Sequence, residues 1–146
     1  MRRALACLGL VVLLVPVPAA ADAAADAAAD GAIRAALERW TADFNAGRAD
    51  RVCDLFSPEL RYDYRGFPER GFEEICGLLK RSLADRTRRF NYAPPVVKEI
   101  VVSGDLAVVR PAGASVAEVS VEPGMDVFRR RPDGSWKIVR YIAYEE

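Results

Sequence analysis

The residue of this sequence with the clearest chemical potential is Asp126, because it lies inside a predicted strand and not in a loop. Pro132, Asp133 and Gly134 are turn-forming residues between two runs rich in β-branched and aromatic side chains, which predicts a β-hairpin over residues 124–144. Alternation along the first strand puts Asp126 on the same side as Phe128. A carboxyl on the buried face of a sheet needs either a charged partner or a pocket that it serves.

The sequence contains no histidine, which removes the Ser-His-Asp triad, the Cys-His pair, the usual zinc sites and the commonest general base. Any chemistry must use carboxylates, tyrosines, Trp40, lysine or arginine. Tyr62 and Tyr64 alternate with Asp63 in a second predicted strand. Asp63 is therefore either a catalytic base or a surface partner of the arginines beside it. We predict no metal and no cofactor.

Composition indicates one globular domain. The chain has 146 residues, 51% of them hydrophobic, with 21 basic and 21 acidic side chains. Zero net charge provides no general field that would attract nucleic acid or anionic lipid, so we expect no nucleic-acid partner.

The N-terminus has the pattern of a signal peptide, predicted over residues 1–21. Two arginines precede an apolar run over residues 4–15, and two prolines then lead to small residues at a cleavage site near Ala21. The run is short for a membrane span, so we expect no membrane attachment after cleavage and a periplasmic or extracellular location. Residues 22–31 are Ala/Asp-rich and predict a linker or frayed helix, followed by the folded domain at 32–146.

Cys53 and Cys76 are the cysteines that remain after cleavage. An even pair in an oxidising compartment predicts a disulfide. The alternative is two buried thiols that pack as small hydrophobic groups. Two cysteines are too few ligands for a metal site.

Hydrophobic periodicity predicts three helices followed by a run of strands. A stripe of four apolar residues ends near Gly47, a short helix begins at Asp50, and a third helix follows the first strand. This order predicts an α+β fold, in which helices pack on the concave face of a curved mixed or antiparallel sheet of four to six strands. The expected strands are at 60–65, 96–102, 106–110 and 116–121, and in the C-terminal hairpin.

Four segments carry a recognisable pattern: residues 39–47 (RWTADFNAG), 54–56 (DLF), 68–71 (PERG) and 123–128 (PGMDVF). They resemble the nuclear transport factor 2-like superfamily, nearest to its ketosteroid isomerase-like and SnoaL-like polyketide cyclase branch. The resemblance covers residues 33–144 and implies the cone-shaped α+β fold and a homodimer. It is specific for the fold and weak for function, because such scaffolds host many activities.

The resemblance also implies roles for individual residues. Asp126 falls where the isomerases keep a protonated acid in the oxyanion hole, and Trp40 falls where they place a tyrosine donor. An indole N–H can donate but cannot exchange a proton, which departs from the family's pattern. The family's catalytic base sits near Asp63, or one position beyond it at Tyr64.

Two classes of function follow. The first is an exported domain whose apolar pocket binds a small hydrophobic molecule. The second is an enzyme of the isomerase, cyclase or dehydratase type, which moves a proton next to a carbonyl with Asp126 and Asp63 as catalytic residues. In both cases we expect the ligand to contact Trp40, Tyr62, Tyr64, Phe128 and Arg140.

Arg140 on the neighbouring strand leaves a structural alternative for Asp126. An ionised Asp126–Arg140 pair would hold the strands together and have no catalytic meaning. Alternation also gives the last strand large apolar groups on both of its sides, with Trp136, Ile138 and Ile142 on one and Val139 and Tyr141 on the other. One side can fill the pocket and the other needs cover, which agrees with a homodimer through the outer face of the sheet.

Overall fold

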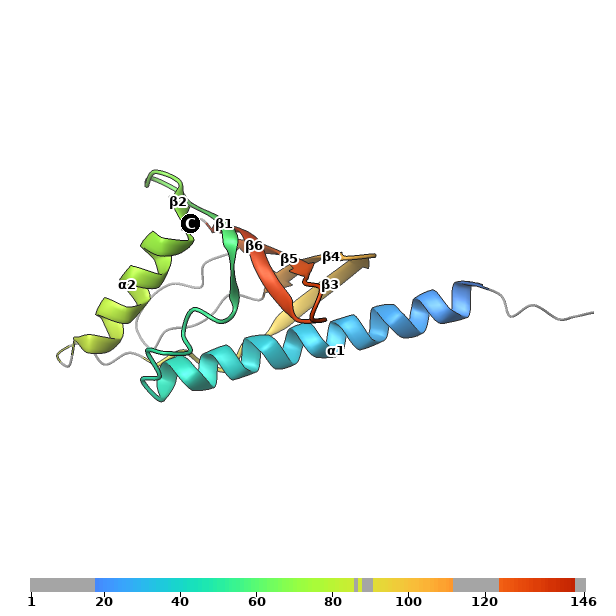
Figure 1. Cartoon of the computed structure of the whole chain (residues 1–146), viewed down its shortest axis with the longest axis horizontal. Coiled ribbons are helices and arrows are strands. Elements are labelled where there is room, and N and C mark those ends of the chain that lie inside the picture. Colours follow the sequence, from blue (N-terminus) through green and yellow to red (C-terminus); the bar gives the residue numbers. More distant parts are fainter. Residues whose placement is uncertain (1–17, 86, 88–90, 112–123, 144–146) are drawn as a thin grey trace, which may run out of the picture.

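The computed structural model describes residues 18–85, 87, 91–111 and 124–143. They form an α+β fold, as predicted, in which one six-stranded sheet is packed against two helices where three were expected (Figure 1). The elements are α1 (Pro18–Asn45), β1 (Phe56–Tyr64), β2 (Arg70–Gly71), α2 (Phe72–Ala84), β3 (Val97–Ser103), β4 (Leu106–Pro111), β5 (Gly124–Arg130) and β6 (Trp136–Ala143).

The sheet has the strand order β2-β1-β6-β5-β4-β3. Strands β1 and β6 pair in parallel and the other neighbours are antiparallel, so the sheet is mixed. Helix α1 runs along one face of the sheet, and α2 stands beside the β1–β2 edge (Figure 1). The expected strand at 116–121 lies outside the described residues.

Helix α1 is long because its first half is rich in alanine, which has the highest helix propensity. Residues 22–31 belong to this helix, and its N-terminal turns extend beyond the sheet (Figure 1). In its second half, Ile33 is buried in the core with residues of the sheet, and Phe44, also buried, packs against the rings of Trp40 and Tyr92. The helix is followed by Gly47 at a φ of 71°, a left-handed conformation that glycine adopts without strain.

The core lies between α1, α2 and the concave face of the sheet. Alternate residues of each strand point into it, and the described core is centred on Leu60 of β1, Val109 of β4, Phe128 of β5 and Ile138 of β6. Helix α2 contributes Ile75. Glu74 in its first turn accepts a hydrogen bond from the Gly71 N–H at 3.1 Å, which satisfies a donor at the helix start.

The short helix predicted from Asp50 is wrong: residues 51–55 form consecutive turns. The Leu55 carbonyl accepts a hydrogen bond from the Ile138 N–H of β6 at 2.9 Å, and the next residue, Phe56, begins β1. Val52 and Leu55 are buried and have the spacing of a helix. The Leu55 carbonyl, however, is hydrogen-bonded to the sheet and not to a following helical turn.

Strand β6 contains a β-bulge at Val139. Val127 of β5 is paired with Arg140, whereas the next residue, Phe128, is paired with Ile138, so Val139 is an extra residue. The bulge reverses the alternation, and Ile138 and Tyr141 both point to the concave face. The expectation that Ile142 shares a side with Ile138 is therefore wrong, and Ile142 is exposed.

Among the described residues, no helix combines the length and the apolar character needed to cross a membrane.

Candidate functional site

A cavity of about 350 Å³ lies between the two helices and the concave face of the sheet. This volume is at the lower end of the ~300–1,000 Å³ typical of small-molecule sites. Most of its lining is apolar, and most of the polar side chains come from the sheet. The described lining includes Leu37, Trp40 and Thr41 of α1, Ile75, Leu78 and Leu79 of α2, Phe56, Tyr62, Tyr64, Arg70, Asp126, Ile138 and Tyr141 of the strands, and Tyr92 of the loop before β3.

Asp126 is the buried acid of this cavity, with only 5% of its surface exposed. Its Oδ1 atom has no hydrogen-bond partner among the described residues. Burial disfavours the charged form and raises the pKa of the Asp126 carboxyl from 3.8 to about 7. Below that pH the group is a neutral O–H donor, and above it the group is a carboxylate that can only accept.

Four polar side chains of the cavity lie in one row across the sheet. Arg70 of β2 is paired with Tyr62 of β1, Tyr62 with Tyr141 of β6, and Tyr141 with Asp126 of β5. The rings of Tyr62 and Tyr141 are stacked, with centroids 4.4 Å apart and planes within 1° of parallel. The row therefore has a cation at the sheet edge, a flat aromatic pair in the middle and an acid at its inner end.

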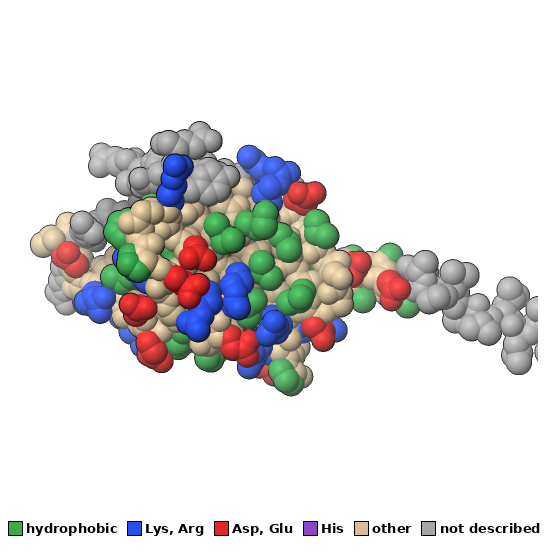
Figure 2. All heavy atoms as spheres, turned by 90° about the horizontal axis from the view of Figure 1, so that it is seen from above, with side chains coloured by type: hydrophobic (Ala, Val, Ile, Leu, Met, Phe, Trp, Pro, Cys, Tyr) green, Lys and Arg blue, Asp and Glu red, His purple; other side chains and the backbone are tan. Residues whose placement is uncertain are grey.

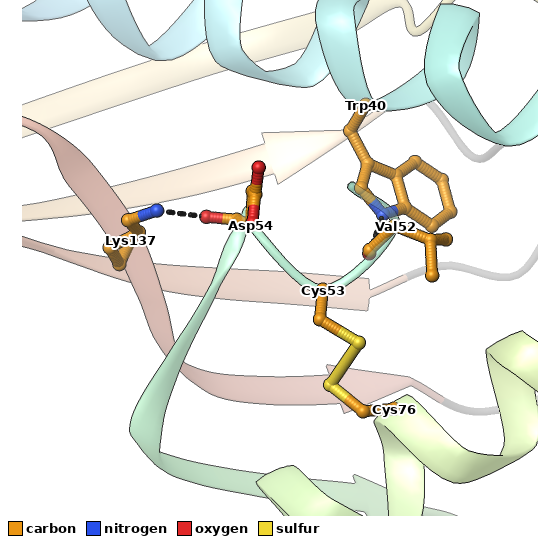
Figure 3. The surroundings of a disulfide bond; sticks show 6 residues. All are labelled: Trp40, Val52, Cys53, Asp54, Cys76 and Lys137. Carbon is orange, nitrogen blue, oxygen red and sulfur yellow. Dashed lines mark hydrogen bonds between the residues drawn. A yellow bond between two sulfur atoms is a disulfide. The ribbon is translucent and has the colours of Figure 1, made fainter. Parts of the chain in front are cut away.

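Trp40 lines the cavity with its ring, but its N–H is directed to the backbone. The indole Nε1 donates to the Val52 carbonyl at 2.8 Å, and Figure 3 shows the ring of Trp40 against the turn that carries Val52. The ring also packs against Phe44 and Tyr92. A donor already paired inside the protein is not available to a ligand, so Trp40 shapes the cavity and does not supply an oxyanion hydrogen bond.

The predicted disulfide is confirmed: Cys53 is bonded to Cys76, with Cα atoms 5.6 Å apart (Figure 3). Cys53 lies in the turn after α1, and Cys76 lies in α2. The bond therefore joins the turn that fixes Trp40 to the helix that forms one wall of the cavity. Lys137 of β6 donates to the carbonyl of Asp54 and ties the same turn to the sheet.

Three of the residues proposed from the sequence are not in the cavity lining. Asp63 is exposed and paired with Ile142. Phe128 is fully buried in the core below the cavity. Arg140 lies on the outer face, where its guanidinium donates to the carbonyls of Glu59 at 3.2 Å and Val139 at 2.6 Å.

The position of Arg140 also decides between the two environments considered for Asp126. Arg140 is paired with Val127, whose side chain alternates with that of Asp126. Burial is accordingly the cause of the raised pKa of Asp126. Trp40, Tyr62, Tyr64 and Asp126 are the proposed site residues that the fold brings together around the cavity.

Sequence reasoning missed Arg70 and Tyr141. Arg70 belongs to the PERG segment, on which the family resemblance partly rests. The sequence alone does not indicate that its side chain lines the cavity. Strict alternation places Tyr141 on the side of β6 opposite to Ile138, because it takes no account of the bulge at Val139. Among the described residues, no group of three or more cysteine, aspartate or glutamate side chains gathers in a way that could hold a metal ion.

Solved structures with the same fold support this architecture. An NTF2-like protein with a cystatin-like fold from Novosphingobium aromaticivorans is 20% identical with a TM-score of 0.65, covering 90% of each chain. A conserved protein from Planctomyces limnophilus is 20% identical with a TM-score of 0.64, covering 80% of this chain and 95% of its own. A ketosteroid isomerase-like protein from Erwinia carotovora is 21% identical with a TM-score of 0.56, covering 78% of this chain and 93% of its own.

At these identities the likeness shows the fold alone. The chain has no match among curated proteins. A family model for the SnoaL-like domain matches residues 37–141, which include both helical walls of the cavity and its row of polar side chains. The chain belongs to the SnoaL-like domain family.

Proposed function

We propose that this domain binds a small, largely apolar molecule in the cavity, and that Asp126 donates a hydrogen bond from its protonated carboxyl to an oxygen of that molecule. The observation that carries the proposal is a buried carboxyl whose Oδ1 atom has no partner among the described residues and which faces an otherwise apolar hollow. Burying such a group without a partner is costly, and a ligand oxygen would offset that cost.

The family and the aromatic lining support the same function. The SnoaL-like, NTF2-like fold commonly binds small hydrophobic ligands or acts as an isomerase. The stacked Tyr62–Tyr141 pair places aromatic ring edges next to Asp126, and such edges pack well against the face of an aromatic ligand. A carbonyl on such a ligand would reach the acid while its ring packs against the tyrosines.

The second candidate function is enzymatic proton transfer next to a carbonyl. It is favoured by the pKa of Asp126, which at about 7 lets the carboxyl give or take a proton near neutral pH. The same reaction would run with a single acid, because Asp63 is exposed on the opposite side of β1. Binding requires only the donor, so we take it as the primary function.

A neutral aromatic ketone, 2-acetylnaphthalene, tests the binding proposal. We expect its affinity for the wild type to fall by roughly tenfold between pH 5 and pH 9, because the Asp126 carboxyl then loses the proton that it donates. In the Asp126→Asn variant we expect several-fold weaker binding at pH 5 and little change with pH. Titration calorimetry or fluorescence over this pH range provides the measurement.

Asp63→Asn is the matched control, since it removes an exposed carboxylate from the same sheet and should leave the pH dependence intact. The absence of binding, or an equal pH dependence in Asp126→Asn, would refute the proposal. Deuterium exchange at the methyl group of the ketone separates the two functions. Exchange that the wild type accelerates and Asp126→Asn does not would establish the enzyme instead.

We further propose that the domain is a homodimer through the outer face of its sheet. Exposed apolar side chains gather there: Val101 is 55% exposed, Leu106 42%, Met125 44% and Ile142 47%. Figure 2 shows apolar side chains in the middle of this face and charged ones around them. Such a patch with a polar rim is typical of a protein–protein interface.

We expect light scattering at micromolar concentration to give the mass of a dimer, and Met125→Arg to give a monomer. Val96→Arg places the same charge at an exposed apolar residue just before β3 and should leave the dimer intact. A monomer mass for the wild type would contradict the interface.

Export after cleavage near Ala21 is also part of the proposal. It is supported by the arginines, apolar run and small residues of the N-terminus, and by the disulfide, which fits an oxidising compartment. Cleavage there would leave α1 beginning close to Asp22. The mass of the secreted protein identifies the new N-terminus, because each cleavage position leaves a chain of different mass.

A further inference from the structure

Arg70 stands out among the cavity residues because it carries a permanent charge at the edge of an apolar hollow. It is half-buried and lines the cavity. Its guanidinium lies over the ring of Phe67, with Cζ 5.1 Å from the ring centroid. Within the described residues, no carboxylate lies within ion-pair distance of it. The adjacent acid, Glu69, is instead paired with Arg61 on the outer side of β1 at 3.5 Å.

The pairing of the strands fixes where Arg70 points relative to the rest of the site. It is opposite Tyr62, and the same cross-strand row continues through Tyr141 to Asp126. Three strand spacings separate the Cα atoms of Arg70 and Asp126, roughly 14 Å. The stacked tyrosines lie between the two, so an elongated molecule that lies across this pair along the row would have one end toward the cation and the other toward the acid.

Charge defines which kind of molecule suits this row. Arg70 and Asp126 are the two residues of charged type in the described lining, and Asp126 is buried in its neutral form below about pH 7. The described lining then carries a net positive charge. A guanidinium presents its N–H donors as a planar fork, which matches the two oxygens of a carboxylate.

We propose that the ligand of this cavity is a small apolar carboxylic acid, bound as its anion, with the carboxylate on Arg70 and a hydrogen-bond acceptor at the opposite end near Asp126. This inference rests on the proposed binding function and adds the chemical class of the ligand. Stacking on Phe67 holds the guanidinium in place, which lowers the entropic cost of pairing it with the anion.

A rigid keto acid and its uncharged counterpart test the proposal. The probes are 6-acetyl-2-naphthoate, its primary amide and 2-acetylnaphthalene, measured by titration calorimetry at pH 6 and low salt. We expect the wild type to bind the acid at least roughly tenfold more tightly than the amide, since hydrogen bonds to charged groups are the stronger ones. Arg70→Gln should abolish this preference and keep the affinity for the amide. Arg70→Lys should keep part of it, because the point charge remains without the fork.

Arg61→Gln is the control, because it removes the same charge from the next strand on the outer face. It should keep the full preference for the acid. If 2-acetylnaphthalene binds but the acid has no advantage over the amide, or if Arg61→Gln removes the advantage as Arg70→Gln does, the anion site is refuted and the apolar pocket stands. If none of the three probes binds, the proposed binding function itself fails.

Discussion

Raising the pH from about 4 to about 7 is expected to lower the free energy of unfolding of the wild type by about 3 kcal/mol relative to Asp126→Asn. The pKa of Asp126 rises from 3.8 in the unfolded chain to about 7 in the folded one, because burial penalises the carboxylate. Between these values the folded state holds a proton that the unfolded state has released. The resulting stability is fully present below the unfolded pKa and is lost as the pH rises through the folded pKa.

The asparagine variant has no group to titrate at this position, so the difference between the two proteins isolates Asp126. Asp133 contributes a slope of opposite sign, since hydrogen bonds from Ser135 lower its pKa, but it is present in both proteins and cancels. The other titratable side chains that line the cavity are also shared: Arg70, Tyr62, Tyr64, Tyr92 and Tyr141. Denaturant titrations at several pH values provide the measurement, and parallel stability curves for the two proteins would show that Asp126 is not buried as an acid.

Loss of the disulfide is expected to lower the free energy of unfolding by about 3 kcal/mol, because the bond closes a loop over a sequence separation of 23. Replacing both Cys53 and Cys76 with alanine removes the bond without leaving a thiol. We also expect weaker ligand binding, since the turn that holds Trp40 and the helix that lines the cavity are no longer joined.

Reduction provides the matched control for this variant. Dithiothreitol should destabilise the wild type to a similar extent and leave the double alanine variant unchanged. Mass spectrometry after alkylation under denaturing, non-reducing conditions should find no free thiol in the mature wild-type protein. Two alkylated cysteines there, or a double variant as stable as the wild type, would contradict the prediction.

Periodicity predicted most of the fold because long elements repeat their pattern many times. The helix at Phe72–Ala84, the strand that carries Tyr62 and the hairpin around Gly134 were all predicted, and Gly134 adopts the left-handed φ of 82° that its turn requires. The turns at residues 51–55 were not predicted, because the few apolar residues there match a turn as well as a helix. A hydrogen bond from distant β6 decides between the two.

The candidate site was harder to predict because it depends on pairing between strands. Asp126 could be placed on the inner face from alternation within β5 alone. Arg70 could not, since β2 has two residues and acquires its direction only by pairing with β1. The function of the Trp40 N–H also depended on a carbonyl twelve residues away, in a segment whose structure was predicted incorrectly.

The extra residue in β6 has an evolutionary meaning for the cavity. Because the bulge at Val139 reverses the alternation, it brings Tyr141 to the inner face between Tyr62 and Asp126 and sends Ile142 outward. Without the bulge, strict pairing onward from Ile138 would place Arg140 opposite Asp126 and turn Tyr141 to the outer face. An aromatic side chain beside the acid would then be replaced by a guanidinium that could pair with it. Gain or loss of such a bulge therefore gives related sequences a way to change the lining of the cavity without a substitution in it.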